Sequence, residues 1–532
     1  MLDVDSLTSY AAAGYARAPL SRRLPLPRAA PSAIYRALAH SRDHFLFETR
    51  ERIGDDGETW SPRMSVIGLE CSERIEVDGK RLVRRRGDTV LEETSDADPL
   101  ALLQRLLASR RAPRIAGSPE FCGGLFGYFG FETARMIEPR LDRRPRKPKP
   151  YELPEIALLI AENAIVFDHS SRHVEIVIDL AIGGLPRSEI ARRRDEGLAR
   201  IDELCQRLEN VDFEDEAIGP EGDRRQPNDP TYVFPQQLFE AATEKARDYI
   251  ADGDIMQVVL SQRSTRQLRC EGIDYYRALT SVCGGPYSYL LTLGDARVVG
   301  VSPETLFRLR DGAVVSRPMA GTRRRGADAV EDLRLEVELR ADPKENAEHM
   351  MLVDLARNDL GRVCEVGSVE VASKLVVERY SHVMHLVSTV IGRAIRQLDG
   401  VDVLRSAFPA GTLSGAPKIR ALEIIDELEP CGRGVYGGAI GYLGWDGDAD
   451  FAIAIRTAVL KDGVLQMQAG AGIVHDSVPR REWQETIEKG RLLTTAAALA
   501  EAIRCPARSA QFPSRRTDSA DSRITANAPH DR

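Results

Sequence analysis

The sequence predicts an α+β protein, with antiparallel hairpins in sheets and helices outside them, and three observations lead to this class. Strand-like runs occur in pairs joined by Gly or Asp turns, at 72–87, 161–180, 287–302, 304–319 and 437–475. Paired runs of this kind are typical of β-hairpins and therefore of antiparallel sheets. Helical periodicity interleaves with the pairs, and the sequence contains no internal repeat. Sheets of hairpins with helices packed outside them define the α+β class.

The N-terminal part of the chain mixes both kinds of element. Residues 1–30 are rich in Ala, Pro and Arg, and we expect them to pack loosely. A helix is expected over 32–40, and residues 187–210 have the pattern of a charged amphipathic helix. The acidic stretch 211–230 carries Pro and Gly and is the best linker candidate in the chain.

The C-terminal part continues with a helix over 235–252, which Gly253 stops, and a strand over 255–268. Further helices are expected at 329–340, 343–360, 401–407, 417–429 and 480–504. The tail 506–532 holds almost nothing to bury and should be disordered. We therefore divide the chain into an N-terminal region over 1–229 with an acidic linker near 209–230, a larger domain over 230–505, and the tail.

Composition disfavours several classes of protein. The 532 residues are 43% hydrophobic and 29% charged, and the net charge of -8 is spread without long runs, which argues against nucleic acid as the main partner. The first thirty residues lack the apolar core of a signal peptide and no stretch approaches ~20 apolar residues, so we expect a cytoplasmic protein. The eight cysteines form no C-x-x-C pair, and we expect reduced thiols rather than zinc ligands or disulfides.

The stretch "DPKENAEHMMLVDLARNDLG" at 342–361 places two glutamates three residues apart at the start of a helix. Asp342 suits the N-cap, and Glu345 can reach back to it in a capping box. Glu348 lies only ~60° further around the helix, so its carboxylate stacks near that of Glu345. Like charges so placed cost about 0.2–0.5 kcal/mol unless a positive group lies between them. A cation site and a solvated helix face are both compatible with this pattern.

The C-terminal helix repeats the arrangement with Glu482 and Glu485, followed one turn later by Lys489. Two helices that each present E-x-x-E could supply oxygen ligands to a hard cation. Mg²⁺ suits such a site because it takes few carboxylates and is usually shared with an anionic ligand. Zinc or copper would need softer ligands nearby. The alternative is a solvated helix end, where acids complement the helix dipole.

Glycine-rich turns at 411–418, 436–442 and 468–474 allow the backbone to approach a ligand closely. Exposed amides in such turns bind anions. Arg456, which we expect within a strand over 451–459, offers a guanidinium fork for a carboxylate. Together with Lys489, these features suggest a pocket for a carboxylated substrate, although hairpin geometry would explain each turn separately.

Seven motifs in a fixed order carry a family resemblance. They read "VSPETLF" from 301, "RPMAGTRRRG" from 317, "KENAEHMMLVDLARNDLG" from 344, "ERYSHVMHLVSTVIG" from 378, "GTLSGAPKIRALEIIDELEP" from 411, "VYGGAIGYLGWDGDADFAIAIRTAV" from 435 and "QAGAGIVHDSVPRREWQETIEKGR" from 468. The chain resembles the chorismate-binding enzymes, most of all the large subunits (component I) of anthranilate synthases, over about 235–500 and weakly over about 34–135. The resemblance implies two lobes whose antiparallel β-sheets pack face to face with helices outside, a catalytic domain over 230–505, and chorismate and Mg²⁺ as ligands.

Two positions indicate which nucleophile this relative uses. Family members that add water carry a lysine base where this chain has Gln257, and the para-aminobenzoate branch carries a lysine nucleophile where it has Ala320. Gln257 cannot take a proton near neutral pH, and Ala320 has no reactive group. The resemblance therefore implies that external ammonia adds to chorismate, which gives aminodeoxyisochorismate and then, after pyruvate leaves, anthranilate.

The resemblance also implies roles for individual residues. Glu304 matches the general acid that protonates the departing hydroxyl, and His385 matches the histidine associated with pyruvate elimination. A structural turn acid and a satisfied core histidine are the alternatives for these two. Substrate-contacting positions match Gly321, Thr322, Thr412, Tyr436, Arg456, Gly470, Ala471, Gly472 and Lys489. The magnesium region matches Glu345, Glu348, Glu482 and Glu485, with Glu348 and Glu485 as the more direct ligands.

A partner and an inhibitor follow from the same resemblance. The chain lacks the G-x-C-x-G elbow of glutamine amidotransferases, so a separate glutaminase subunit is the implied partner. Tryptophan-inhibited relatives carry L-L-E-S and P-Y-M segments, which here read Leu46-Phe47-Glu48-Thr49 and Pro286-Tyr287-Ser288. We expect tryptophan to bind with altered affinity, because Thr49 adds a methyl group and Ser288 replaces the methionine.

Three other functions remain open at this point. The chain could stop at aminodeoxyisochorismate, against which His385 argues mildly, or it could be a 4-amino-4-deoxychorismate synthase. It could also be a non-catalytic regulatory relative, against which the intact acids, Arg456 and Lys489 argue more strongly.

Overall fold

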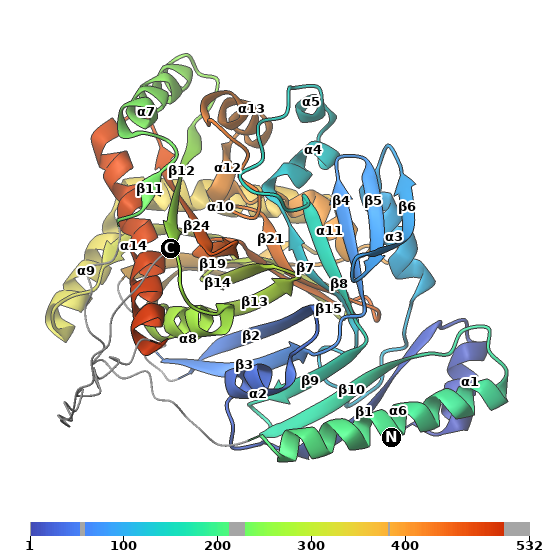
Figure 1. Cartoon of the computed structure of the whole chain (residues 1–532). Helices are drawn as coiled ribbons and strands as arrows, with labels where there is room; N and C mark the ends of the chain where they lie inside the picture. The colour runs from blue at the N-terminus through green and yellow to red at the C-terminus, as the bar shows by residue number, and fades with distance from the viewer. Residues whose placement is uncertain (1, 54–58, 212–228, 381–382, 505–532) are drawn as a thin grey trace, which may run out of the picture.

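The computed structural model describes residues 2–53, 59–211, 229–380 and 383–504. They form two antiparallel sheets of 12 strands each, with helices around them (Figure 1). The predicted α+β class is confirmed, since the expected hairpins supply strands to both sheets. Most of the predicted linker and the whole predicted tail, 506–532, lie outside the described residues. No helix within the described ranges is long and apolar enough to cross a bilayer.

The first sheet combines strands from distant parts of the chain. In spatial order they are β1 (Arg17–Pro25), β10 (His173–Ala181), β9 (Asn163–Asp168), β3 (Thr59–Gly68), β2 (Asp43–Ile53), β13 (Tyr287–Leu293), β14 (Ala296–Ser302), β23 (Thr457–Lys461), β24 (Val464–Ile473), β12 (Gln257–Gln267) and β11 (Thr231–Tyr232), with β20 (Gly415–Ala416) also pairing β12. Direct pairing of β2 with β13 joins the predicted N-terminal region to the larger domain within this sheet.

The second sheet is built in the same mixed way. Its order is β17 (Met319–Arg324), β19 (Val383–Arg393), β16 (Ala313–Ser316), β15 (Thr305–Arg310), β22 (Ala449–Ile453), β21 (Ala439–Gly444), β7 (Gly124–Phe129), β8 (Ile156–Ala161), β4 (Glu73–Asp78), β5 (Arg81–Arg86) and β6 (Thr89–Ser95), with β18 (Glu370–Arg379) also pairing β19. Here β7 pairs with β21, so strands from both sides of residue 230 again lie side by side.

The helices lie outside the sheets (Figure 1). They are α1 (Val4–Ala12), α2 (Pro31–Leu38), α3 (Pro99–Ser109), α4 (Ala134–Ile137), α5 (Pro139–Asp142), α6 (Arg187–Glu209), α7 (Gln236–Ala251), α8 (Gly272–Val282), α9 (Ala329–Ala341), α10 (Pro343–Gly361), α11 (Gly400–Ala407), α12 (Gly411–Ser414), α13 (Lys418–Leu428) and α14 (Pro479–Arg504), with a 3-10 turn at Phe131–Thr133. Helix α14 packs on β24, α13 on β12, and α10 on β17 and β19. The predicted helices are confirmed within two residues at each end.

Aromatic side chains fill the space between the two sheets. The ring of Phe45 on β2 stacks on that of Phe126 on β7, with centroids 3.9 Å apart. Phe47 contacts Phe126, Tyr287 and Tyr442, which come from both sheets. Rings in such offset and edge contacts contribute beyond the area they bury. The predicted face-to-face packing of the sheets is therefore confirmed.

The expectation that residues 1–30 pack loosely is wrong. Helix α1 is capped by the Asp3 carboxylate, and β1 pairs with β10 along its whole length. Leu7 and Leu20 are fully buried. The Ala, Pro and Arg content suggested a loose segment, but its leucines lie on the faces that pack, and composition alone does not show this.

The run 451–459 is two strands, not one. Strand β22 ends at Ile453 in the second sheet, and β23 begins at Thr457 in the first. Arg456 lies between them with φ of 48°, so its predicted place within a strand is wrong. A non-glycine residue with positive φ costs backbone strain that the surrounding structure must offset, and such residues cluster at functional sites.

Candidate active site

Glu304 lies in the short turn that leads from β14 into β15, at the junction of the two sheets. Its side chain is 5% exposed, and its Oε1 accepts a hydrogen bond from Oγ1 of Thr412 on α12 at 3.0 Å. Burial raises the pKa of Glu304 to about 8, while the Thr412 hydrogen bond and the charge of Arg456 act in the opposite direction. The structure therefore brings together Glu304, Thr412 and Arg456, which are all predicted site residues. The carboxyl group of Glu304 holds its proton at neutral pH.

A bulge in β17 presents the next group of predicted residues. Gly321 has φ of 81° and interrupts the pairing with β19 between Ala320 and Thr322. A Cβ at Gly321 would lie 3.1 Å from Leu386, so both the backbone and the space require glycine. The bulge directs Oγ1 of Thr322 to Nδ1 of His385, 3.0 Å away. The structure thus brings the predicted residues Thr322 and His385 into contact.

A buried histidine supports this bulge and was not predicted. Nδ1 of His349 donates to the carbonyl of Ala320 at 3.3 Å, and its Nε2 is 2.7 Å from Oγ of Ser388. His349 is completely buried, and burial lowers its pKa, so it stays neutral. Its position directly after Glu348 in the sequence was the available signal. The histidine therefore fixes the backbone at Ala320.

Glu345 does not form the predicted capping box. Asp342 does cap α10, accepting hydrogen bonds from the amides of Lys344 and Glu345 at 2.9 and 3.3 Å. The reciprocal bond is absent, because the Asp342 amide donates to the carbonyl of Leu339. The Glu345 carboxylate instead takes a 2.8 Å ion pair from Arg323 and a 3.3 Å hydrogen bond from the Thr322 amide. Glu345 therefore ties α10 to the bulge of β17.

Glu348 and Glu482 share an electrostatic environment although they belong to different helices. Burial raises the pKa of each, and in each case the nearby lysines Lys344 and Lys489 act to lower it. Nε2 of Gln257 donates to Glu348 at 3.2 Å, which joins β12 to α10. Lys489 in turn pairs with Glu485 at 2.7 Å and donates to the carbonyl of Gly470 at 3.0 Å. Both glutamates therefore lie within electrostatic reach of the same two lysines.

The four predicted metal residues do not converge as a ready-made cluster. Among the described residues, no three histidine, cysteine, aspartate or glutamate side chains are placed to hold one metal ion. Glu345 and Glu485 are paired with Arg323 and Lys489, which leaves Glu348 and Glu482 as partly buried carboxylates with raised pKa. Two carboxylates and no softer ligand fit Mg²⁺, which is usually bound by one or two carboxylates together with water and an anionic ligand.

The predicted turn over 468–474 is wrong, because these residues mostly belong to β24, and side chains fill the space beside its glycines. A Cβ at Gly470 would lie 2.9 Å from Oη of Tyr436, and one at Gly472 would lie 2.7 Å from Nε2 of Gln257. The side chain of Ala471 is buried in the core, so this residue can offer a ligand only its backbone. Burial raises the pKa of Tyr436, which keeps its hydroxyl a hydrogen-bond donor.

The two predicted tryptophan segments are neighbours in the first sheet. Thr49 lies opposite Tyr287, and Glu48 lies opposite Ser288, where β2 pairs with β13. The Glu48 carboxylate accepts hydrogen bonds from Tyr276 and Ser65. The carbonyl of Pro286 extends this pairing of the two segments by accepting a hydrogen bond from the Arg50 amide at 2.8 Å.

The hydroxyl of Thr49 is the unusual group in these segments. Thr49 is 1% exposed, and its Oγ1 has no hydrogen-bond partner within the part of the chain that the structure describes. An unpaired buried hydroxyl is costly, and it calls for a ligand or a water.

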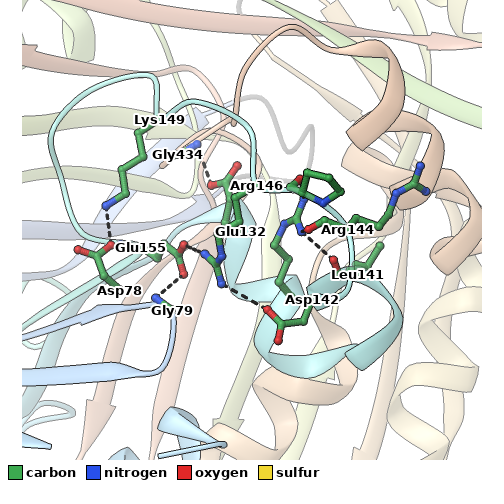
Figure 2. Close-up of polar contacts among 12 residues, drawn as sticks. Asp78, Gly79, Glu132, Leu141, Asp142, Arg144, Arg146, Lys149, Glu155 and Gly434 are labelled. Atoms are coloured by element: carbon green, nitrogen blue, oxygen red, sulfur yellow. Dashed lines mark hydrogen bonds and ion pairs between the residues drawn. The ribbon is translucent and has the colours of Figure 1, made fainter. Parts of the chain in front are cut away.

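A well-defined cavity lies elsewhere and contains none of the predicted site residues. It has a volume of about 450 Å³ and lies between the β4–β5 turn, α4 and α13 (Figure 2). Glu132 accepts from the amides of Arg433 and Gly434 at 2.7 and 3.0 Å, and Lys149 pairs with Asp78 at 2.6 Å. Its charged groups therefore satisfy one another, in contrast to Glu348 and Glu482.

Comparisons with known proteins identify the family. Residues 50–495 match the family model described as chorismate binding enzyme. Over 494 residues the chain is 47% identical to anthranilate synthase component 1 of Pseudomonas aeruginosa, covering 92% of this chain and 97% of that protein. It is 49% identical over 416 residues to the protein of the same name from Streptomyces coelicolor, covering 77% and 79% respectively.

Solved structures give the same result for the fold. The crystal structure of anthranilate synthase component I from Streptococcus pneumoniae superposes with a TM-score of 0.70 at 35% identity, covering 82% of this chain and 93% of that one. The menaquinone-specific isochorismate synthase of Escherichia coli superposes with a TM-score of 0.65 at 20% identity, covering 90% and 94%. At that identity the second likeness supports the fold alone.

Proposed function

Because the chain belongs to the chorismate-binding enzymes, we propose that it is the large subunit of an anthranilate synthase, which converts chorismate and ammonia into anthranilate and pyruvate. The ammonia comes from glutamine through a separate glutaminase subunit. The reaction is the first step of tryptophan biosynthesis and takes place in the cytoplasm. The names of the curated relatives support this choice within the family.

The burial of Glu304 beside Thr412 is the observation that carries the proposal. A carboxyl group with a pKa of about 8 keeps its proton at neutral pH and can act as a general acid. In the reaction, the C–N bond forms as ammonia adds at the ring carbon ortho to the carboxylate. The C–O bond of the ring hydroxyl breaks, and Glu304 supplies the proton with which that oxygen leaves as water.

The choice of ammonia as nucleophile rests on Gln257 and Ala320. The Gln257 amide is not a base, and its Nε2 is engaged by Glu348. Ala320 offers no amine, and its carbonyl is held by His349. Neither an activated water nor a lysine of this chain can therefore attack at these positions. Elimination of pyruvate follows, with His385 and Thr322 placed to handle the proton that the ring loses.

Substrate binding uses the surrounding cations and backbone. Arg456, which lies between β22 and β23 with positive φ, provides a fork for one carboxylate, and we assign further ligand contact to the backbone at Gly472, which is less buried than Gly470. Lys489 adds a second positive charge. Because Glu485 pairs with Lys489, Glu348 and Glu482, and not the expected Glu348 and Glu485, would be the direct ligands of Mg²⁺, which would supply the positive charge that a substrate carboxylate needs.

Tryptophan inhibition is part of the proposal. The inhibitor would bind against the paired segments Glu48–Thr49 and Pro286–Ser288, and the unpaired hydroxyl of Thr49 supports a polar ligand there. Thr49 and Ser288 leave the affinity different from that of relatives with serine and methionine at these positions.

The purified chain provides the test. With chorismate, ammonium salt at raised pH and Mg²⁺, anthranilate fluorescence should rise, and EDTA should abolish the rise. An inert chain under these conditions would instead favour a non-catalytic relative.

A further inference from the structure

Three residues on adjacent strands of the first sheet form a row that leads toward Glu304. Thr49 of β2 lies opposite Tyr287 of β13, and Tyr287 lies opposite Ser302 of β14. Ser302 precedes Glu304 by two residues in the chain. The row therefore connects the segments assigned to the inhibitor with the turn that carries the acid.

Ser302 fixes the backbone of Glu304 from one side. It is completely buried, and its hydroxyl donates to the carbonyl of Ile453 at 2.7 Å. The same hydroxyl accepts from the Glu304 amide at 3.2 Å. The Ile453 amide donates to the Glu304 carbonyl at 3.0 Å. Both backbone polar groups of Glu304 are thus held, and the position of its carboxyl group depends on Ser302 and Ile453.

Tyr287 holds the same segment from the other side. Its hydroxyl donates to Oδ1 of Asp450 on β22 at 2.7 Å and accepts from Oγ1 of Thr305 on β15 at 3.2 Å. Arg308 donates to the second oxygen of Asp450 at 2.8 Å, which fixes that carboxylate. Because Thr305 directly follows Glu304, one tyrosine of the first sheet anchors the acid-bearing turn to the second.

We propose that Tyr287 is a positioning residue for Glu304, and that a ligand bound at Glu48 and Thr49 acts on the reaction through it. The inference rests on the proposed function, which makes Glu304 the acid. A ligand that engages the Thr49 hydroxyl acts on β2 at the residue paired with Tyr287. Any displacement of Tyr287 reaches Thr305 through its hydroxyl and Ser302 through strand pairing, so the Glu304 carboxyl moves relative to Thr412. Packed interfaces pass on such shifts as discrete rearrangements.

The test compares Tyr287→Phe with Tyr289→Phe in the full chain assembled with its glutaminase partner. Tyr289 is a matched control, because it lies on the same strand, is completely buried, and bonds through its hydroxyl to Thr457 at 2.6 Å within the first sheet. Tyr287→Phe should lower kcat by about tenfold to a hundredfold, as a misplaced acid does, with the chorismate KM changed less than about twofold. The alkaline limb of its kcat profile should also move. Tyr289→Phe should match the wild type in kcat, in the KM for chorismate and in the pH profile of kcat.

A second measurement does not depend on activity. Hydrogen exchange of the backbone amides at 303–308 should speed up in Tyr287→Phe and not in Tyr289→Phe, and tryptophan should change the same amides in the wild-type chain. Equal exchange, kcat and pH profiles in the two variants would overturn the inference. An inert wild-type chain would refute the proposed function, while the exchange data would still decide whether Tyr287 anchors the turn.

Discussion

The hydroxyl of Thr412 donates a hydrogen bond to the carboxyl group of Glu304 at 3.0 Å, in surroundings that leave Glu304 only 5% exposed. Burial is the largest influence on this group and raises its pKa to about 8. The bond from Thr412 stabilises the ionised form and so keeps the pKa lower than burial alone would. A protonated acid at the end of β14 is the feature on which the account of the reaction depends.

The pH dependence of kcat should report this acid. At constant free ammonia, kcat should fall as the pH rises through about 8, because Glu304 then loses the proton that it must donate. Thr412→Val removes the hydrogen bond that stabilises the carboxylate, so the pKa of Glu304 rises and the fall moves to higher pH. Thr412→Ser keeps the donor and should retain the wild-type profile. A profile that is flat through this range, or a shift to lower pH in Thr412→Val, would contradict the assignment.

Ala320→Lys should cripple anthranilate formation. The new amine would lie beside Gly321 and Thr322, where the neighbouring family branch carries its nucleophile, and would divert ammonia chemistry at the ring. Ala320→Met adds a side chain of similar length without an amine and separates bulk from chemistry. Mass spectrometry of the products formed from chorismate and ammonium distinguishes an effect of bulk from an effect of the new amine. Unchanged anthranilate turnover in Ala320→Lys would remove the reason for excluding that branch.

The bulge at Gly321 should matter for activity beyond its effect on stability. Gly321→Ala and Gly312→Ala both place a Cβ on a residue with positive φ, at 81° and 75°, and each should lose about 1–2 kcal/mol of unfolding free energy. Gly312 has nothing within 4 Å of the added atom, whereas Gly321 meets Leu386 at 3.1 Å. Denaturant unfolding measures the stability loss of both variants, and kcat measures their activity. Only Gly321→Ala should lose activity. Equal kcat in both variants would show that the bulge does not place Thr322.

Loss of the carboxylate of Glu348 or of Glu482 should weaken the response of the activity to magnesium. Glu348→Gln and Glu482→Gln each remove a partly buried carboxylate with raised pKa, and the Mg²⁺ concentration for half-maximal activity should rise about 10–100-fold. Glu488→Gln, an exposed position on the same helix as Glu482, is the control. Magnesium titrations that coincide for all three variants would place the ion elsewhere.

The sequence pattern predicted the helices and strands well, because the residues that cap, end or pair each of them lie close by in the chain. The cap at Asp342, the stop at Gly253 and the paired strands of β13 and β14 are all fixed by neighbouring residues. The choice of ammonia as nucleophile came from the family resemblance at Gln257 and Ala320, and it stays a prediction.

The remaining features depend on tertiary partners that the sequence does not display. Arg456 was placed in a strand because the apolar run continues past it, yet its positive φ carries the chain from one sheet to the other. Glu345 was given a capping bond, but Arg323, 22 residues away in the chain, takes its carboxylate. The support from His349 and the anchoring by Tyr287 likewise arise only once distant strands have paired.

Incubation of the full chain with chorismate, Mg²⁺ and ¹⁵N-labelled ammonium, followed by mass spectrometry, tests the central claim most directly. The account predicts anthranilate that carries the label, and little of it from Glu304→Gln, in which a general acid worth about 10²–10⁴-fold in rate is lost. Unlabelled isochorismate, labelled 4-amino-4-deoxychorismate, or full activity in Glu304→Gln would contradict it.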